Sequence, residues 1–309
     1  MEGQMDRRQL MSAAALGAAG ALMFAPGRGH AAESAAKRPA ESFVAAKDGT
    51  ALFVRDWGTG QPVLFLSGWA LPSDFWGYQM LGLARKGYRA VAYDRRGHGR
   101  SADPGRGYDH DTLADDLAAV IDGLALDGVT IIAHSMGGTE VARHFARLGG
   151  RGIARVVLVG TITPFLMKGP DNPAGVDPAM LAEGAALLAR DFPAWIEVNT
   201  PPFFTPDTSP AMVRWGQNMM MSTSLLGAAQ LAAANFATDF RPDVRRITAP
   251  VMLIHGDRDV SAPLALTAQA TAALLPQATL KVYEGAPHGL PLTHVERLTG
   301  DLLAFLADG

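Results

Sequence analysis

The stretch Val129-Thr-Ile-Ile-Ala-His-Ser-Met-Gly-Gly138 decides the fold, because an apolar run stops at a serine and helix-forming sequence follows at once. A short apolar run bounded by turn residues predicts a buried strand. A serine on such a strand-to-helix corner projects its hydroxyl, and small residues two positions before and after it let strand and helix approach closely. Ala133 and Gly137 occupy those positions. The stretch therefore predicts a nucleophile elbow with Ser135 as the nucleophile.

Outward from this corner, apolar strands alternate with segments of helical spacing. Strands are expected at 51–57, 62–66, 89–93, 129–133, 155–159, 251–254 and 279–283. Helices are expected at 112–124, 136–148, 262–275 and 292–306. This alternation predicts an α/β fold with a mostly parallel sheet and helices on both faces, whose ligands bind at the carboxyl ends of the strands. We expect strands 51–57 and 62–66 to be antiparallel neighbours.

The alternation breaks between residues 163 and 243, where prolines gather and short amphipathic helices replace strands. We interpret 163–243 as a helical cap inserted into an α/β core made of residues 42–162 and 244–309. Four large apolar side chains of the cap are candidates for the wall of a substrate pocket: Phe192, Trp195, Trp215 and Met219. Packing between cap helices is the ordinary alternative for such side chains.

The N-terminus carries the pair Arg7-Arg8 ahead of the mildly apolar run 10–25, and the small-residue stretch 29–32 follows. These features predict a signal peptide of the twin-arginine type over 1–32 and a flexible leader over 33–41. The run is shorter than the roughly 20 residues that a membrane span needs. We therefore expect handling by the export machinery, a periplasmic or secreted mature protein, and no stable membrane span after processing.

The composition excludes several classes of protein. The 309 residues contain no cysteine, which excludes disulfides, thiolate metal sites and a cysteine nucleophile. The net charge is −3 and no basic patch is visible, so nucleic acid is not an expected partner. Histidines and carboxylates nowhere show metal-ligand spacing, and we expect neither a metal nor a cofactor.

A serine hydroxyl attacks carbonyl groups only when a base takes its proton and an acid orients that base. In folds with this elbow the chain order is serine, acid, histidine. Strand 251–254 runs into two carboxylates, Asp257 and Asp259, and His288 follows the last predicted strand. Asp259 lies further into the loop and is the preferred acid, whereas Asp257 is assigned to the turn. The expected triad is Ser135, Asp259 and His288.

Acyl transfer also needs N–H donors for the oxyanion that develops on the carbonyl oxygen. One donor is expected from the residue after the nucleophile, Met136, and one from the loop after strand 62–66. In that loop Ser67-Gly-Trp69 places Gly68 before Trp69, and we expect the glycine to allow a tight bend that turns the Trp69 amide inward.

Together these motifs resemble the α/β-hydrolase superfamily. The resemblance rests on the elbow, Ser67-Gly-Trp69, Tyr93-Asp-Arg-Arg-Gly-His-Gly-Arg-Ser101, Ile254-His-Gly-Asp-Arg-Asp259 and Gly285-Ala-Pro-His-Gly-Leu290. More narrowly, Asp171-Asn-Pro-Ala-Gly175, Phe240-Arg-Pro-Asp243 and Ala286-Pro-His-Gly-Leu-Pro-Leu-Thr-His294 resemble the cofactor-free, non-haem chloroperoxidase and arylesterase branch.

That branch implies serine esterases which, with a short carboxylic acid and peroxide, also form peracids that oxidise halide. Two residues depart from its pattern: Ser67 stands where members usually have histidine, and Ala70 where perhydrolysis-proficient members tend to have proline. We therefore expect a serine carboxylic ester hydrolase that acts on small to medium apolar esters through an acyl-enzyme. A lactonase, perhydrolase or haloperoxidase with the same triad is the alternative, and a ligand-binding protein on a hydrolase scaffold is a third hypothesis.

Overall fold

A computed structural model describes residues 42–308 and contains one eight-stranded sheet with the strand order β1-β2-β4-β3-β5-β6-β7-β8. The strands are β1 (Phe43–Ala45), β2 (Ala51–Trp57), β3 (Pro62–Leu66), β4 (Arg89–Tyr93), β5 (Val129–His134), β6 (Ile153–Val159), β7 (Val251–Gly256) and β8 (Thr279–Tyr283). The pairs β1–β2 and β2–β4 are antiparallel, and the other pairs are parallel. The predicted mostly parallel sheet is confirmed.

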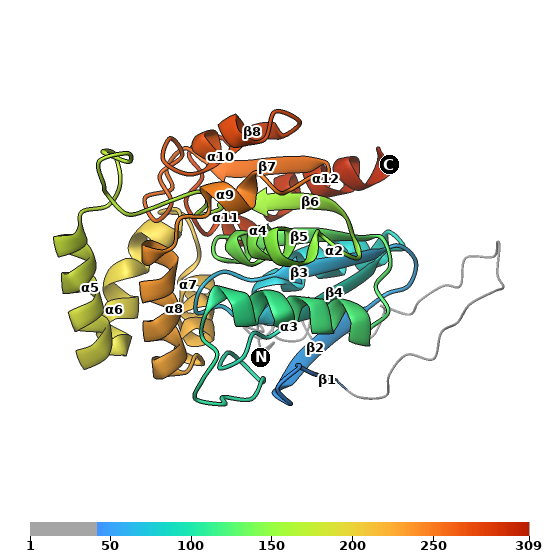
Figure 1. Cartoon of the computed structure of the whole chain (residues 1–309), viewed down its shortest axis with the longest axis horizontal. Helices are drawn as coiled ribbons and strands as arrows, with labels where there is room; N and C mark the ends of the chain where they lie inside the picture. The colour runs from blue at the N-terminus through green and yellow to red at the C-terminus, as the bar shows by residue number, and fades with distance from the viewer. Residues whose placement is uncertain (1–41, 309) are drawn as a thin grey trace, which may run out of the picture. The chain divides into compact units, whose positions relative to one another are not determined.

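Helices cover both faces of the sheet, as Figure 1 shows. The α-helices are α2 (Gly77–Arg85), α3 (His110–Gly123), α4 (Gly137–Leu148), α5 (Pro178–Arg190), α6 (Phe192–Asn199), α7 (Pro210–Met221), α8 (Leu225–Ala237), α9 (Arg241–Val244), α10 (Ala268–Leu274), α11 (Leu290–Thr293) and α12 (Val295–Ala307). Two 3-10 helices, η1 (Ser73–Trp76) and η2 (Pro201–Phe203), lie in connecting segments.

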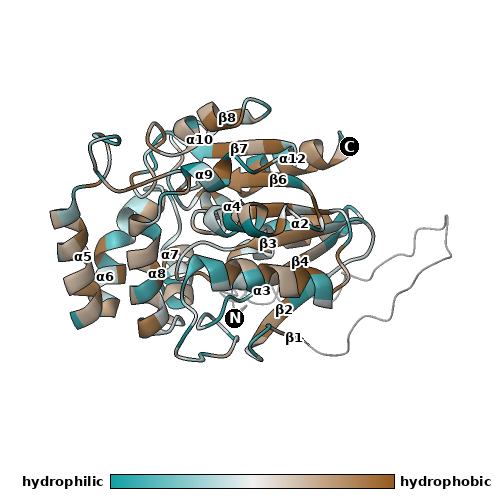
Figure 2. Ribbon diagram, in the orientation of Figure 1, coloured by the Kyte–Doolittle hydropathy of each residue, from teal (hydrophilic) through white to brown (hydrophobic). Residues whose placement is uncertain are grey.

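Alternate side chains of each strand enter two different cores, as a pleated strand requires. On β3, Val63 and Phe65 pack in a buried cluster with residues of α2 and α12, while Leu64 and Leu66 pack with residues of α3 and α4. All six residues of β5 are buried, because it is a central parallel strand with both faces covered. Figure 2 shows the strands coloured mainly as hydrophobic.

The expectation that strands 51–57 and 62–66 are neighbours is wrong. β4 lies between them and pairs antiparallel with β2 and parallel with β3. The short connection from β2 to β3 is typical of a hairpin, but both edges of β3 are taken by the parallel partners β4 and β5.

Two of the predicted helices also differ from the observed ones. The helix expected at 262–275 begins only at Ala268, because the Ala262 amide donates to the Asp259 carboxylate and the intervening residues form turns on Pro263. The helix expected at 292–306 is divided at His294 into α11 and α12, since His294 has a non-helical backbone.

Between β6 and β7 the chain forms the helices α5 to α8, which lie together beside the sheet (Figure 1). We call α5 to α8 and their connections the cap. One tie between cap and core is the indole of Trp69, whose Nε1 donates to the Ala228 carbonyl on α8 at 2.9 Å. No helix within residues 42–308 is long and apolar enough to span a membrane. The predicted signal peptide and leader lie outside the described residues.

Candidate active site

The elbow is the corner between β5 and α4. Ser135 has a left-handed backbone with φ 52°, and its amide donates to the Val159 carbonyl at 2.9 Å. A Cβ at Gly137 would lie 2.9 Å from the Leu66 carbonyl oxygen, so a larger residue there would push α4 away from β3. Ala133 is fully buried and meets the same demand for a small side chain. The corner thus holds the serine in a conformation that few non-glycine residues adopt.

The structure brings Ser135, His288 and Asp259 together in one line of hydrogen bonds. His288 Nε2 lies 3.0 Å from Ser135 Oγ, and His288 Nδ1 lies 2.7 Å from Asp259 Oδ2. All three residues are buried. Asp257, the competing carboxylate, is instead exposed and accepts from the Gly285 amide at 2.7 Å, which fixes the loop that leads to His288. The imidazole therefore has a proton acceptor on one side and a hydroxyl on the other.

The Asp259 carboxylate is held by two further groups. Its Oδ1 accepts from the Ala262 amide at 2.7 Å. Its Oδ2 lies 3.3 Å from His255 Nε2, and this same nitrogen donates to the Ala262 carbonyl at 2.7 Å. Burial lowers the pKa of His255, so the ring is neutral and acts as a donor. His255 was not among the predicted site residues, although it precedes Asp259 by four residues at the end of β7.

His134 packs against the His288 imidazole and bonds its backbone. Its Nε2 donates to the His288 carbonyl at 3.0 Å, and the two rings lie 4.6 Å apart. Burial lowers the pKa of His134 well below its usual range, and the neighbouring His288 lowers it further. His134 therefore stays neutral.

The loop after β3 brings Trp69 close to the elbow. The Gly68 carbonyl accepts from the Leu71 amide at 3.3 Å, so Gly68 begins a turn, and its backbone is not left-handed. A Cβ at Gly68 would lie 2.7 Å from His134 Nδ1, so glycine allows the close approach of the loop to the elbow. The left-handed residue is Ala70, with φ 56°. The Ser67 hydroxyl donates to the Pro72 carbonyl at 2.9 Å and closes the loop. Ser67 thus supplies an internal hydrogen bond at the position where the resemblance implies histidine.

A buried ion pair that was not among the predicted site residues supports this loop. Arg95 donates to the carbonyls of Ser67 at 2.7 Å and Gly68 at 3.2 Å, and it pairs with Glu140 on α4 through Nε at 2.7 Å and through Nη2. Tyr93 donates to the same carboxylate at 3.1 Å. Because the Gly68 carbonyl and the Trp69 N–H belong to one planar peptide unit, Arg95 orients that N–H. The available signal was an arginine two residues after the end of the buried strand β4.

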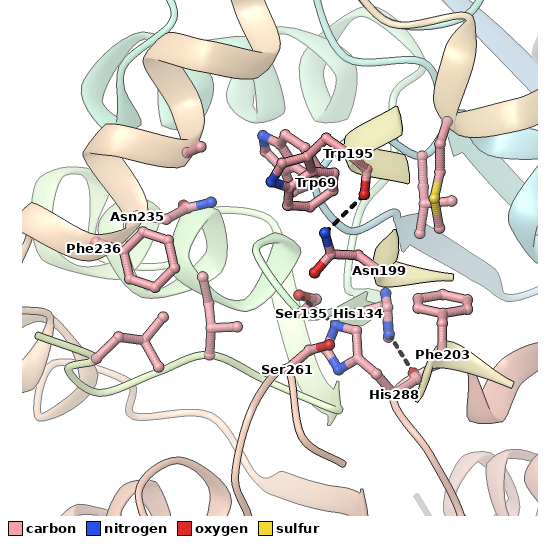
Figure 3. A pocket seen from close by; sticks show the side chains of 15 residues that line it. Trp69, His134, Ser135, Trp195, Asn199, Phe203, Asn235, Phe236, Ser261 and His288 are labelled. Carbon is pink, nitrogen blue, oxygen red and sulfur yellow. Dashed lines mark hydrogen bonds between the residues drawn. The ribbon is translucent and has the colours of Figure 1, made fainter. Parts of the chain in front are cut away.

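A cavity of about 240 Å³ opens over Ser135 and His288, with walls from both core and cap (Figure 3). Its lining consists of Trp69, Leu71, His134, Ser135, Ile162, Leu166, Trp195, Asn199, Phe203, Met220, Ala232, Asn235, Phe236, Ser261 and His288. No lysine, arginine, aspartate or glutamate is among them. Nor do the described residues 42–308 bring three histidine or carboxylate side chains together as a metal site requires.

Of the four cap residues expected in the pocket wall, Trp195 is a lining residue. Phe192 is buried one layer back, with its ring 6.2 Å from that of Trp69. Trp215 stacks edge-on against Tyr78, and Met219 is buried in the core cluster, while its neighbour Met220 reaches the cavity. Adjacent residues of a helix point in different directions, and the sequence does not say which face of each cap helix turns inward.

The fold and the elbow define the class of protein. A sequence profile described as the Alpha/beta hydrolase family matches residues 63–299, and the chain belongs to this family. Within it, the chain is 43% identical to the non-heme chloroperoxidase of Streptomyces lividans over 85% of this chain and 98% of that protein. The resemblance to the non-haem chloroperoxidase branch is thereby confirmed.

Two further similarities fit this placement. The chain is 35% identical to the bifunctional esterase/perhydrolase of Acinetobacter calcoaceticus, over 85% of this chain and 99% of that one. The crystal structure of bromoperoxidase from Bacillus anthracis superposes with a TM-score of 0.82 at 33% identity, covering 85% of this chain and 99% of that chain. The protein is thus a hydrolase of a branch that includes esterases and haloperoxidases.

Proposed function

We propose that this protein is a serine carboxylic ester hydrolase that works through an acyl-enzyme on Ser135. The observation that carries the proposal is the unbroken line of hydrogen bonds from Ser135 through His288 to Asp259. His288 takes the proton of the hydroxyl as Ser135 Oγ attacks the ester carbonyl, and returns it to the departing alcohol. Water then attacks the acyl-enzyme with the same imidazole as base, which releases the acid and frees Ser135.

The amides of Trp69 and Met136 are the proposed donors to the oxyanion. Within residues 42–308 neither N–H is a donor in the hydrogen bonds of turns, loops and caps. Met136 directly follows the nucleophile, and Trp69 lies in the loop that Arg95 orients. Preorganised donors of this kind stabilise the charge that develops in the transition state, and one donor contributes about 3 kcal/mol.

The cavity supports small to medium, largely apolar esters. Its volume of about 240 Å³ lies below the range of about 300–1,000 Å³ that is common for pockets of drug-sized ligands. Aromatic and aliphatic side chains make up most of the lining, so an acyl or alcohol chain of a few carbons would bury its apolar surface there.

The direct test is replacement of Ser135 combined with covalent labelling. We expect Ser135→Ala to lose at least about 10⁴-fold in kcat on short p-nitrophenyl esters, and to lose labelling by an organophosphonate. Ser135→Gly is the companion variant, because glycine tolerates the φ of 52° and separates strain from lost chemistry. Full activity of both variants would contradict the proposal, and so would tight ligand binding without turnover by the wild type.

Perhydrolysis or haloperoxidation is the second candidate, favoured by the names of the relatives. One observation favours hydrolysis: Ala70 has φ 56°, which the proline at this position in perhydrolysis-proficient members cannot adopt, since its ring holds φ near about −65°. The loop beside Trp69 therefore differs from theirs. Partitioning of the acyl-enzyme between hydrogen peroxide and water, measured at equal ester concentration, distinguishes the two activities.

Lactones are the other alternative substrates of the same triad, and parallel assays on esters and lactones of equal size decide between them.

We further propose export by the twin-arginine route, on the grounds of Arg7 and Arg8 before a mild apolar segment. Replacement of both arginines by lysine is expected to leave the protein in the cytoplasm. Unchanged fractionation of that variant would contradict the proposal.

A further inference from the structure

One polar side chain in the wall of the cavity stands apart from the others. Asn235 on α8 is 6% exposed, and its Oδ1 is buried with no hydrogen-bond partner among the described residues. Figure 3 shows the carboxamide pointing from α8 into the cavity, across from His288. Asn199, also in the lining, differs because its Nδ2 donates to the Trp195 carbonyl at 2.8 Å. Asn199 is moreover an exposed residue, whereas Asn235 is buried and its oxygen has no partner among the described residues.

Such a group is costly to the fold. A buried polar atom without a partner forfeits the hydrogen bonds it made to water in the unfolded chain, and native structures contain few of them. The lining beside Asn235 is apolar, with Ala232 and Phe236 on the same helix. A leucine would fill this place without that cost. The carboxamide is therefore best explained by a partner that enters the cavity.

We propose that Asn235 binds a second polar group of the substrate, so that the preferred substrates are esters or lactones that also carry an amide or a hydroxyl group. This inference rests on the proposed esterase function and narrows it. A carboxamide has hydrogen-bond donors and an acceptor, and an amide or a hydroxyl group on the substrate can pair with either. Carboxylates, phosphates and ammonium groups fit poorly, because no acidic or basic side chain other than histidine lines the cavity to compensate a desolvated charge.

The size of the cavity limits how far the second group lies from the ester. Its volume of about 240 Å³ lies below the range of about 300–1,000 Å³ that is common for pockets of drug-sized ligands. The ester lies at Ser135, so the amide or hydroxyl is separated from it by a few atoms. Esters with long apolar tails are thus not the expected substrates, and short bifunctional ones are.

The test compares substrates matched in length. On the acyl side the pair is p-nitrophenyl hexanoate and the p-nitrophenyl ester of N-acetyl-β-alanine; on the alcohol side it is pentyl acetate and 2-acetamidoethyl acetate. In one of the two pairs, we expect Asn235→Leu to lower kcat/KM about tenfold for the amide member and less than twofold for the apolar member. Equal changes within both pairs would overturn the inference. Absence of ester hydrolysis by the wild type would instead defeat the proposed function itself.

Two controls separate recognition from folding. Asn218→Leu makes the same change on an exposed face of cap helix α7, away from the cavity lining, and should leave the preference within each pair unchanged. The melting temperature of Asn235→Leu is expected to equal or exceed that of the wild type, because an unpaired buried polar group is removed. A large drop would show that Asn235 serves the fold and would overturn the inference. Asn235→Ala, free of any steric conflict, should show the same loss of amide preference.

Discussion

The core around Ser135, at the carboxyl ends of the strands, and the cap are built differently. In this part of the core every residue of β5 is buried, and the charges of Arg95 and Glu140 are paired and buried as well. In the cap, α5 buries only Leu188 of its 13 residues, and contact with the catalytic loop is made by aromatic rings and one indole hydrogen bond. Segments with few buried contacts open at lower free energy. We therefore expect the core that holds Ser135 to be rigid and the cap that forms the pocket wall to open more easily.

The largest effect is expected from the acid of the triad, in this part of the core. Asp259→Asn keeps the shape but can no longer hold the imidazole in the productive tautomer, and we expect kcat to fall about 10⁴-fold. Asp257→Asn is the matched control, two residues away, and should stay within about threefold because an asparagine oxygen still accepts from Gly285. Comparable losses in both variants would show that the loop, and not the acid, is what matters.

The buried ion pair is next in size. Arg95→Met leaves Glu140 buried and uncompensated, which we expect to cost about 3–5 kcal/mol of unfolding free energy in urea titrations. In the surviving folded protein kcat should fall with little change in KM, because the orientation of the Trp69 amide acts on the transition state. The double variant Arg95→Met, Glu140→Met should be more stable than Arg95→Met alone. If it is not, the two charges are not coupled and the contrast with the cap weakens.

A change in the cap should alter specificity and spare the chemistry. Trp195→Ala enlarges the cavity, and we expect the ratio of kcat/KM for p-nitrophenyl octanoate over acetate to rise about tenfold, as one or two accommodated methylenes allow. Trp215→Ala removes an equal ring that stacks on Tyr78 outside the cavity lining, and the same ratio should not move. A collapse of kcat on acetate in Trp195→Ala would mean that the cap also shapes the reacting centre.

The smallest effect concerns the stability of the fold at acid pH. The histidines that affect it lie in the core, because residues 163–243 contain no histidine. Burial lowers the pKa of His98 to about 3 and of His144 to about 4. Between these values and the ordinary value of about 6.5 the unfolded chain binds protons that the folded chain does not, so stability falls as the pH falls. His144→Leu should reduce that slope by at most about 1.4 kcal/mol per pH unit, measured by urea unfolding at pH 5 and 7. An unchanged slope would contradict a neutral buried His144.

The parallel part of the fold was predictable because each of its signals is local. A fully buried strand reads as an apolar run, and the elbow combines such a run with small residues at fixed offsets. Pairing order was not predictable, since β2 and β3 are close in the chain and yet separated by β4. The short connection between two strands is visible in the sequence, but it does not show which other strand each of them pairs with.

The positions of the catalytic candidates followed from strand ends, but the residues around them did not. Ser135, Asp259 and His288 each come after a strand of one parallel sheet, so topology alone gathers them. Arg95, Glu140 and His255 act through contacts between segments far apart in sequence, and no local pattern distinguishes a buried ion pair from a solvated one. The cap is harder still, because Met219 and Met220 differ only in the face of α7 that they occupy.

Trp69 connects the two regions in a way that bears on turnover. Its backbone lies in the loop that Arg95 orients, and its indole is bonded to α8, the helix that also carries Asn235. On the proposed role of Asn235, a substrate group bound there would steady the helix to which the Trp69 loop is attached. Binding energy gained several atoms away from the ester would then appear in kcat and not only in KM. We expect short esters that fail to reach α8 to bind adequately and yet to turn over slowly.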